Sequence, residues 1–199
     1  MDKQILQESY KLFHQFGIRS VTMEDISKHL SISKKTLYKY FSKKEDLVYQ
    51  IAKGKIKANE LKCIEICNAS DNAIHEMILM MQILRELFKG MNSSVLFDLQ
   101  KYYNKAWQLM EEHQNVFVRH LIEKNLARGI KEQLYRKDIN IAILAKLRLE
   151  EVRLSFNPLV FEGHTLEEVQ LSLLEHFMLG ITTIKGHTMA NEYKENTNE

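Results

Sequence analysis

The chain has 199 residues, a formal net charge of +2 and 45% hydrophobic residues, an ordinary composition for one or two compact globular units. No apolar run approaches the roughly 18–20 residues of a membrane span, and residues 1–4 lack the features of a secretion signal, so we expect a cytoplasmic protein. One proline and seven glycines leave long stretches free to form helices, and two cysteines suit a reducing compartment.

The N-terminal third predicts three short helices and the start of a long one. Apolar residues at helical spacing end at Gly17, which tolerates the backbone of a helix C-terminus. Thr22 and Ser33 are good N-cap residues, and residues 42–45 have the spacing of a capping box. The predicted helices are therefore 3–16, 22–30, 34–41 and a long one from Ser42 through Ile64.

The rest of the chain also predicts helices, with a loop over 156–164 that holds the only proline. No strand alternation, internal repeat or low-complexity tract is present. The predicted helices are 71–91, 94–103, 104–134, 138–155 and 165–186. We expect an all-α fold of about nine helices, in which a compact three-helix N-terminal domain precedes a larger helical domain. The expected boundaries are 1–47, 48–190 and a polar tail over 191–199.

Positive charge is concentrated near the N-terminus. Residues 1–50 carry nine Lys or Arg and six Asp or Glu. Six lysines follow one another without an intervening acid, namely Lys28, Lys34, Lys35, Lys39, Lys43 and Lys44. Such a patch on an otherwise neutral protein is expected of a protein that binds the phosphate backbone of nucleic acid, although a solvated lysine face has the same pattern.

The segment 22–41 fits a helix-turn-helix, which needs two short helices joined by a turn of three or four residues. Its apolar positions supply an inner face: Ile26, Leu30, Ile32, Leu37 and Phe41. Its polar positions leave an outer face on the second helix: Lys34, Lys35, Thr36, Tyr38 and Lys39. A narrow helix with a polar face of this kind can enter the major groove of DNA.

At these residues the chain resembles the TetR family of bacterial repressors. The matching strings are VTMEDI at 21–26, LSIS at 30–33, TLYKYF at 36–41 and KEDL at 44–47. The resemblance covers roughly residues 3–50. The rest of the chain resembles the family only in its architecture, a long helix followed by several helices and a final pair. The resemblance implies that 1–47 is a helix-turn-helix DNA-binding domain and that 48–190 is a helical ligand-binding and dimerisation domain.

The resemblance implies DNA contacts at ten positions: Thr22, Met23, Ser33, Lys34, Lys35, Thr36, Tyr38, Lys39, Tyr40 and Lys44. Residues 34–36 lie where the family reads bases, and Lys44 lies where a family lysine meets a phosphate. Tyr40 could instead be mainly structural. The family often has glycine at the place of Ser31, so the turn could be slightly strained or have a different φ here. It often has glycine or alanine at the place of Lys35, and the longer lysine could contact either a base or a phosphate.

A homodimer is expected because operators for helix-turn-helix proteins are usually palindromic. The last two predicted helices each carry an apolar stripe that could form a four-helix bundle with a partner. The candidate interface residues are Ile143, Leu147, Leu154, Leu174, Phe177, Met178 and Ile181. Both stripes could instead belong to the core of a single chain.

An effector pocket is expected among the middle helices, lined by adaptable methionine and aromatic side chains. The candidates are Met77, Met81, Phe97, Trp107, Met110 and Phe117, which could equally be ordinary core residues. The function that follows is a repressor released from a palindromic operator by a small, largely apolar effector. Alternatives are a regulator without such an effector and an all-helical enzyme or carrier. No catalytic motif is present, and neither a metal nor a cofactor is expected.

Overall fold

The computed structural model describes residues 1–157 and 159–197, apart from the side chains of 196 and 197. These residues form two compact units that are each described separately. The first contains Met1–Asn59 and Gly90–Glu112, and the second contains Glu60–Lys89 and the chain from His113 onward. No β-strand is found within the described ranges, which confirms the all-α class.

The first unit is built from α1 (Asp2–Phe16), α2 (Met23–His29), α3 (Lys34–Tyr40), the first part of α4 (Lys44–Ala69), α6 (Ser94–Tyr102) and α7 (Asn104–His113). The side chain of Thr22 accepts a hydrogen bond from the backbone N–H of Asp25, and the carboxylate of Asp25 accepts one in return, which makes a capping box. Ser33 caps α3 by accepting from the N–H of Thr36. Gly17 ends α1 at a φ of 84°, so these three start and stop signals are confirmed.

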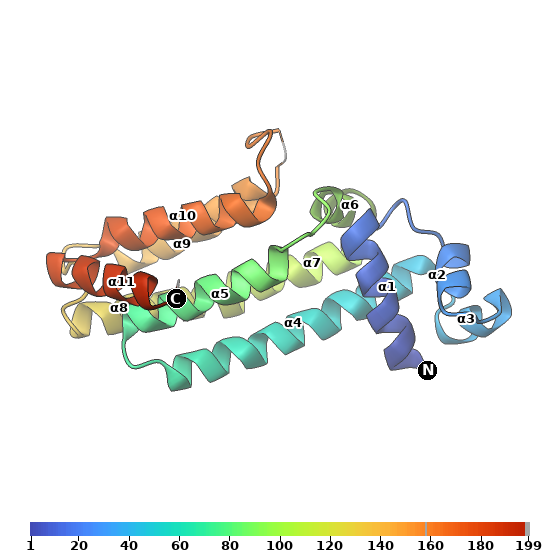
Figure 1. Cartoon of the computed structure of the whole chain (residues 1–199), viewed down its shortest axis with the longest axis horizontal. Coiled ribbons are helices and arrows are strands. Elements are labelled where there is room, and N and C mark those ends of the chain that lie inside the picture. The colour runs from blue at the N-terminus through green and yellow to red at the C-terminus, as the bar shows by residue number, and fades with distance from the viewer. Residues whose placement is uncertain (158, 198–199) are drawn as a thin grey trace. The chain divides into compact units, whose positions relative to one another are not determined.

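The second unit contains α5 (Ala73–Phe88), the π-helix η1 (Gln114–Val118), α8 (Arg119–Lys131), α9 (Ile141–Ser155), α10 (Leu166–Ile181) and α11 (Ile184–Thr197). Figure 1 shows α9 and α10 lying side by side. Its core gathers buried apolar side chains from α5, α8, α9, α10 and α11, and Leu126 and Met178 are fully buried. No helix in the described part of the chain is long and apolar enough to cross a membrane.

The chain departs from the predicted helices most clearly near Thr182. The predicted helix over 165–186 is in fact two helices, because the chain becomes extended at Thr182 and pairs with Tyr135 in an antiparallel bridge. The N–H of Thr183 donates to the carbonyl of Leu134 at 2.9 Å, and a Cβ on Gly186 would lie 2.2 Å from that oxygen. The chain after 190 continues α11 as far as Thr197, where the sequence predicts a polar tail.

The other departures are smaller. The predicted helix over 104–134 is interrupted by η1, which no periodicity indicates. The predicted capping box at 42–45 is wrong, because the hydroxyl of Ser42 donates to the carboxylate of Asp46 at 2.6 Å and α4 begins at Lys44. Counting α7, η1 and α8 as one continuous helix, the described residues form ten helices, and α11 is the one beyond the predicted nine.

Candidate nucleic-acid interface

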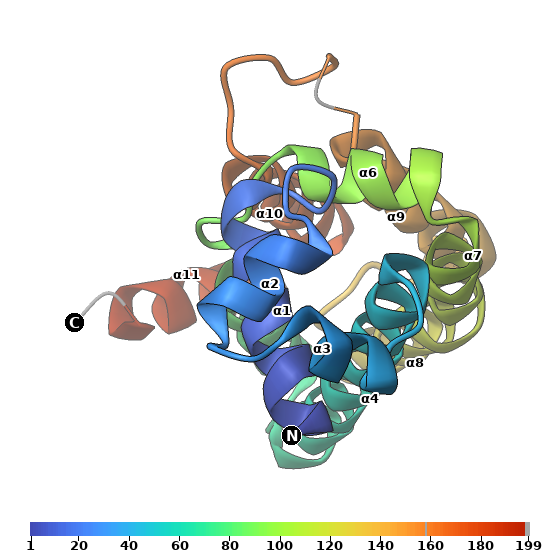
Figure 2. The ribbon, with the colours of Figure 1, turned by 90° about the vertical axis from the view of Figure 1, so that its right-hand side faces the viewer.

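The segment from Thr22 to Phe41 forms two short helices joined by a tight turn. Ile26 and Leu37 are fully buried, and Phe41 is also buried, so the inner face of this pair packs as its apolar pattern predicts. Ser31 lies in the turn at a φ of 55°, a left-handed conformation that glycine adopts more easily than serine. Figure 2 shows α2 and α3 next to the start of α4.

The outer face of α3 is polar and open to solvent. The side chains of Lys34, Lys35 and Lys39 are exposed, and Thr36 is partly buried. Tyr38 and Tyr40 are 48% and 47% exposed, so neither ring is fully buried within its own chain. Three ammonium groups and two phenol hydroxyls are thus available on a helix of seven residues, a set that can donate hydrogen bonds to phosphates and base edges.

The carboxylate of Glu24 forms an ion pair with one of the lysines of this face, Lys34. Glu24 of α2 lies 2.6 Å from the ammonium of Lys34 and 3.0 Å from that of Lys28. The hydrogen bond from Lys34 is the largest cause that lowers the pKa of Glu24, and the same bond raises the pKa of Lys34. Both groups therefore stay charged, and the ammonium of Lys34 has to leave this carboxylate before it can pair with another anion.

Two of the predicted contact residues have intramolecular surroundings, and their DNA contacts stay a prediction. The side chain of Met23 is only 8% exposed, so it packs inside the unit. The ammonium of Lys44 donates to the carbonyl oxygen of Ile18 and lies 5.5 Å from the ring centroid of Phe13. Burial lowers the pKa of Lys44. Its described contacts are thus intramolecular, where the resemblance implies a phosphate.

The comparisons with known proteins agree with this geometry. Residues 5–51 match the family model for bacterial regulatory proteins of the tetR family. The chain is 30% identical, over 189 residues, to the HTH-type transcriptional regulator YvaF of Bacillus subtilis (strain 168), and the match covers 92% of this chain and 96% of that protein. The chain belongs to the TetR family. It is a DNA-binding transcriptional regulator, as the helix-turn-helix and its resemblance predict.

Solved structures share the TetR-family fold over almost the whole chain. A TetR-family regulator from Agrobacterium tumefaciens has a TM-score of 0.75 at 15% identity and covers 92% of this chain and 97% of its own. A regulator from Saccharomonospora viridis in complex with choline has a TM-score of 0.71 at 16% identity, with coverage of 92% and 97%. The regulator FadR from Bacillus subtilis in complex with stearoyl-CoA has a TM-score of 0.67 at 18% identity, with coverage of 90% and 98%.

The two apolar stripes predicted to form the dimer interface lie on α9 and α10 and differ in exposure. Ile143, Leu147 and Leu154 of α9 are exposed, at 64%, 48% and 47%. The four candidates on α10 are buried in the core of the second unit, so for these the alternative of an intramolecular core applies: Leu174, Phe177, Met178 and Ile181. The exposed residues of α10 include Ser172, His176 and Gly180, which recur every four residues and which the apolar pattern could not indicate.

The six candidate effector residues are divided between the two units. Phe97, Trp107 and Met110 belong to the first unit, and Met77, Met81 and Phe117 belong to the second. Phe97 is exposed, and the ammonium of Lys101 lies 5.2 Å from its ring centroid. Met77 is buried in the core of the second unit, and Met81 packs against that core. The assignment of these residues to a pocket stays a prediction.

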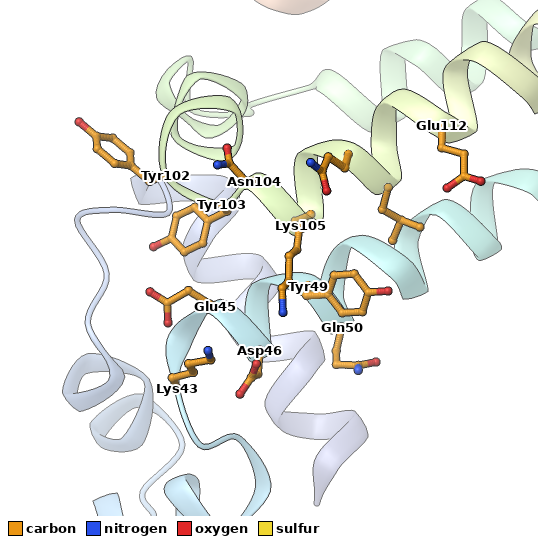
Figure 3. Close-up of a pocket in the computed structure, with 13 residues that line it drawn as sticks. Lys43, Glu45, Asp46, Tyr49, Gln50, Tyr102, Tyr103, Asn104, Lys105 and Glu112 are labelled. Atoms are coloured by element: carbon orange, nitrogen blue, oxygen red, sulfur yellow. The ribbon is translucent and has the colours of Figure 1, made fainter.

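A groove of about 730 Å³ lies within the first unit, between the start of α4 and the beginning of α7. Figure 3 shows the side chain of Lys105 extending toward α4, near Tyr49. Most of the residues that line it have polar or charged side chains, among them Glu45, Asp46 and Tyr103. None of the six candidate effector residues lines this groove.

Proposed function

We propose that this TetR-family regulator is a repressor that binds a palindromic operator as a homodimer and leaves it when a small, largely apolar ligand binds. The observation that carries the proposal is the solvent-exposed set of lysine and tyrosine side chains on α3, set on the buried contacts of Ile26 and Leu37. A rigid inner face orients this set, and its charges supply affinity for phosphates.

Operator recognition is assigned to residues of this face and of the helix caps, all of them exposed except the partly buried Thr36. They are Thr22, Ser33, Lys34, Lys35, Thr36, Tyr38, Lys39 and Tyr40. Lys34 and Lys35 lie in the first turn of α3, where side chains of a recognition helix reach base edges. The tyrosine hydroxyls and Thr22 fix the position on the backbone. Met23 contributes through its buried side chain to the packing of α2.

The test is footprinting of the purified protein on genomic fragments, followed by affinity measurements at several salt concentrations. We expect protection of a palindromic site. Replacing Lys35 with alanine should reduce the slope of log K against log salt by about one if that lysine meets a phosphate. Lys137→Ala, at an exposed lysine of the second unit, is the matched control and should leave the slope unchanged. Binding that is independent of sequence would refute operator recognition.

The dimer is proposed to form through the exposed stripe of α9, with a second copy of this chain as the occupant. Ile143, Leu147 and Leu154 are large apolar side chains left uncovered on one helix. Gly180 on the neighbouring α10 is exposed, and a Cβ there would meet nothing within 4 Å. An open backbone beside an apolar stripe permits close approach of a symmetric partner, as in four-helix bundles.

Leu147→Glu tests the dimer, because a buried leucine contributes about 1.5–3 kcal/mol and a carboxylate there is repelled from an apolar interface. We expect sedimentation to show monomers and operator affinity to fall steeply. Leu61→Glu is the matched control, since Leu61 is similarly exposed on α4. A Leu147→Glu protein that stays dimeric would place the interface elsewhere.

An effector is proposed because proteins of this fold have been solved with choline and with stearoyl-CoA. The chain has one tryptophan, Trp107, and a change in its fluorescence reports binding in its neighbourhood. A ligand at 100 times its Kd raises the free energy of unfolding by about 2.7 kcal/mol, which a thermal-shift screen of apolar compounds detects. Operator release by a compound that raises Tm supports the proposal. A screen in which no compound does both favours a regulator without a small-molecule effector.

A further inference from the structure

The corner between α1 and α2, residues 17–21, is bonded to α6 as well as to its own helices. The N–H of Arg19 donates to Oδ2 of Asp98 at 2.8 Å, and this carboxylate belongs to a residue that is only 5% exposed. Just before α6, the N–H of Asn92 donates to the carbonyl of His14 at 2.8 Å. Residues nearly eighty positions apart in the sequence are thereby fixed together inside the first unit.

One peptide group of this corner is held at both ends. The carbonyl of Ile18 and the N–H of Arg19 belong to the same peptide unit. The ammonium of Lys44 on α4 donates to the carbonyl, and the carboxylate of Asp98 on α6 accepts from the N–H. A cation at the oxygen and an anion at the hydrogen complement the dipole of the peptide group. We call this arrangement the Ile18–Arg19 peptide clamp.

The corner also follows the surface of α6 toward its last turn. The guanidinium of Arg19 donates to the hydroxyl of Tyr102 at 2.7 Å and lies 4.6 Å from the centre of that ring. At the other end, a Cβ on Gly17 would lie 2.4 Å from Oγ of Ser94, so the backbone approaches the first turn of α6 closely. The contacts thus extend along the whole length of α6, from Ser94 to Tyr102.

The corner leads directly into the DNA-binding helices. Thr22, the N-cap of α2, follows Arg19 after two residues. Ile18 and Val21 are buried, so this segment has little freedom to rearrange. The position of the Ile18–Arg19 peptide therefore determines where α2 begins. In turn α3 packs on α2, and Ile26 of α2 and Leu37 of α3 are fully buried.

A buried carboxylate is costly unless hydrogen bonds compensate it, and an apolar side chain would fill the same place more cheaply. We propose that Asp98 is a positioning residue for operator binding, which holds the N–H of Arg19 and so fixes where α2 begins. This inference rests on the proposed operator binding, and it names a residue outside the DNA-contacting face on which that binding depends.

The experiment compares Asp98→Ala and Asp98→Asn in the full chain, at a temperature where circular dichroism shows both to be folded. Asp98→Ala removes the acceptor of the Arg19 N–H, and we expect operator affinity to fall about tenfold, because only a fraction of the free protein then keeps the placement of α2 that fits the operator. Affinity for non-operator DNA depends on phosphate contacts alone and should change little, so the specificity ratio should fall. Asparagine keeps an acceptor oxygen and should recover most of the loss.

Asn125→Ala is the matched control, because Asn125 is also buried and hydrogen-bonded but lies in the second unit, where its amide donates to the carbonyl of Ala73. It should lower Tm without changing the specificity ratio. An Asp98→Ala protein with lowered Tm and an unchanged specificity ratio overturns the inference and leaves Asp98 a purely structural residue. Failure of the unmodified protein to prefer any operator is a different result, and it refutes the proposed function itself.

Discussion

Replacing Lys44 with methionine separates an internal role for this lysine from contact with a phosphate. Methionine keeps most of the aliphatic length that packs near Phe13, and it removes the donor to the carbonyl of Ile18. A hydrogen bond to a charged group contributes about 1.5–3 kcal/mol when it is buried. Because Lys44 is half-buried and water can reach the freed carbonyl in part, we expect a loss of about 1–2 kcal/mol in the free energy of unfolding.

Two measurements test this expectation on the same preparation. For a chain of this length a loss of 1 kcal/mol lowers Tm by about 2–4 °C, so calorimetry should show a decrease of roughly 2–8 °C. Titration of operator DNA at several salt concentrations gives the number of phosphates that the protein neutralises. The slope for Lys44→Met should equal that of the unmodified protein, although the affinity falls because the Ile18–Arg19 peptide group loses one of its two partners.

A contrary result is easily recognised. If the ammonium of Lys44 neutralises a phosphate in the complex, the slope decreases by about one and Tm changes little. That outcome would mean that Lys44 exchanges the carbonyl of Ile18 for DNA, and it would restore the role that the family resemblance implies.

Three further substitutions have definite expected outcomes. Ser31→Gly relieves a left-handed backbone in the helix-turn-helix turn and should raise the free energy of unfolding by about 0.5–1 kcal/mol in urea titrations, without loss of operator affinity. Gly129→Ala places a Cβ 2.0 Å from the ring of Tyr135 and should cost about 1–3 kcal/mol in the same assay; an unchanged midpoint would contradict the packing. Burial lowers the pKa of His113, so the unfolded chain binds a proton first as pH falls below 6.5, and stability should decrease there. His113→Gln should abolish that decrease, as unfolding measured between pH 5 and 8 would reveal.

The helices could be predicted from the sequence where a local signal determines them. Thr22, Ser33 and Gly17 act through hydrogen bonds to residues three or four positions away, and such signals are visible in a short string. Ser42 shows the limit of this reasoning. The sequence allows the hydroxyl of Ser42 to accept from a backbone amide or to donate to the carboxylate of Asp46, and in the folded chain it donates to the carboxylate.

The break at Thr182 could not be predicted, because its cause lies nearly fifty residues away. The extended backbone there exchanges hydrogen bonds with the segment around Leu134 and Tyr135, and the absence of a side chain at Gly186 allows the close approach. Helical periodicity continues through 186 and gives no sign of this pairing.

Within the DNA-binding face, the sequence predicts exposure better than contact. The helical period alone places Lys35, Lys39 and Tyr38 outside and Leu37 inside, and these assignments agree with the observed burial. The burial of Met23 and the contacts of Lys44 depend on the segments that pack around them, and no local pattern reports that packing. The same holds for the candidate residues of α10, since an apolar stripe looks alike whether it faces a partner or its own core.

The two lysines at the start of α3 are not equivalent, and their difference bears on specificity. Lys34 is already paired with Glu24 at 2.6 Å, whereas the ammonium of Lys35 has no ion-pair partner among the described residues. A free, exposed ammonium has the full attraction to any phosphate, so we expect Lys35 to strengthen binding to DNA of every sequence. Contact of Lys34 with DNA is favourable only where the new acceptor is better placed than the carboxylate of Glu24, and a guanine edge with two acceptors meets that condition more readily than a poorly aligned base. We therefore expect Glu24 to raise the selectivity of Lys34 at the expense of affinity. Glu24→Gln should increase binding to non-operator DNA more than binding to the operator, and a larger gain for the operator would refute this reasoning.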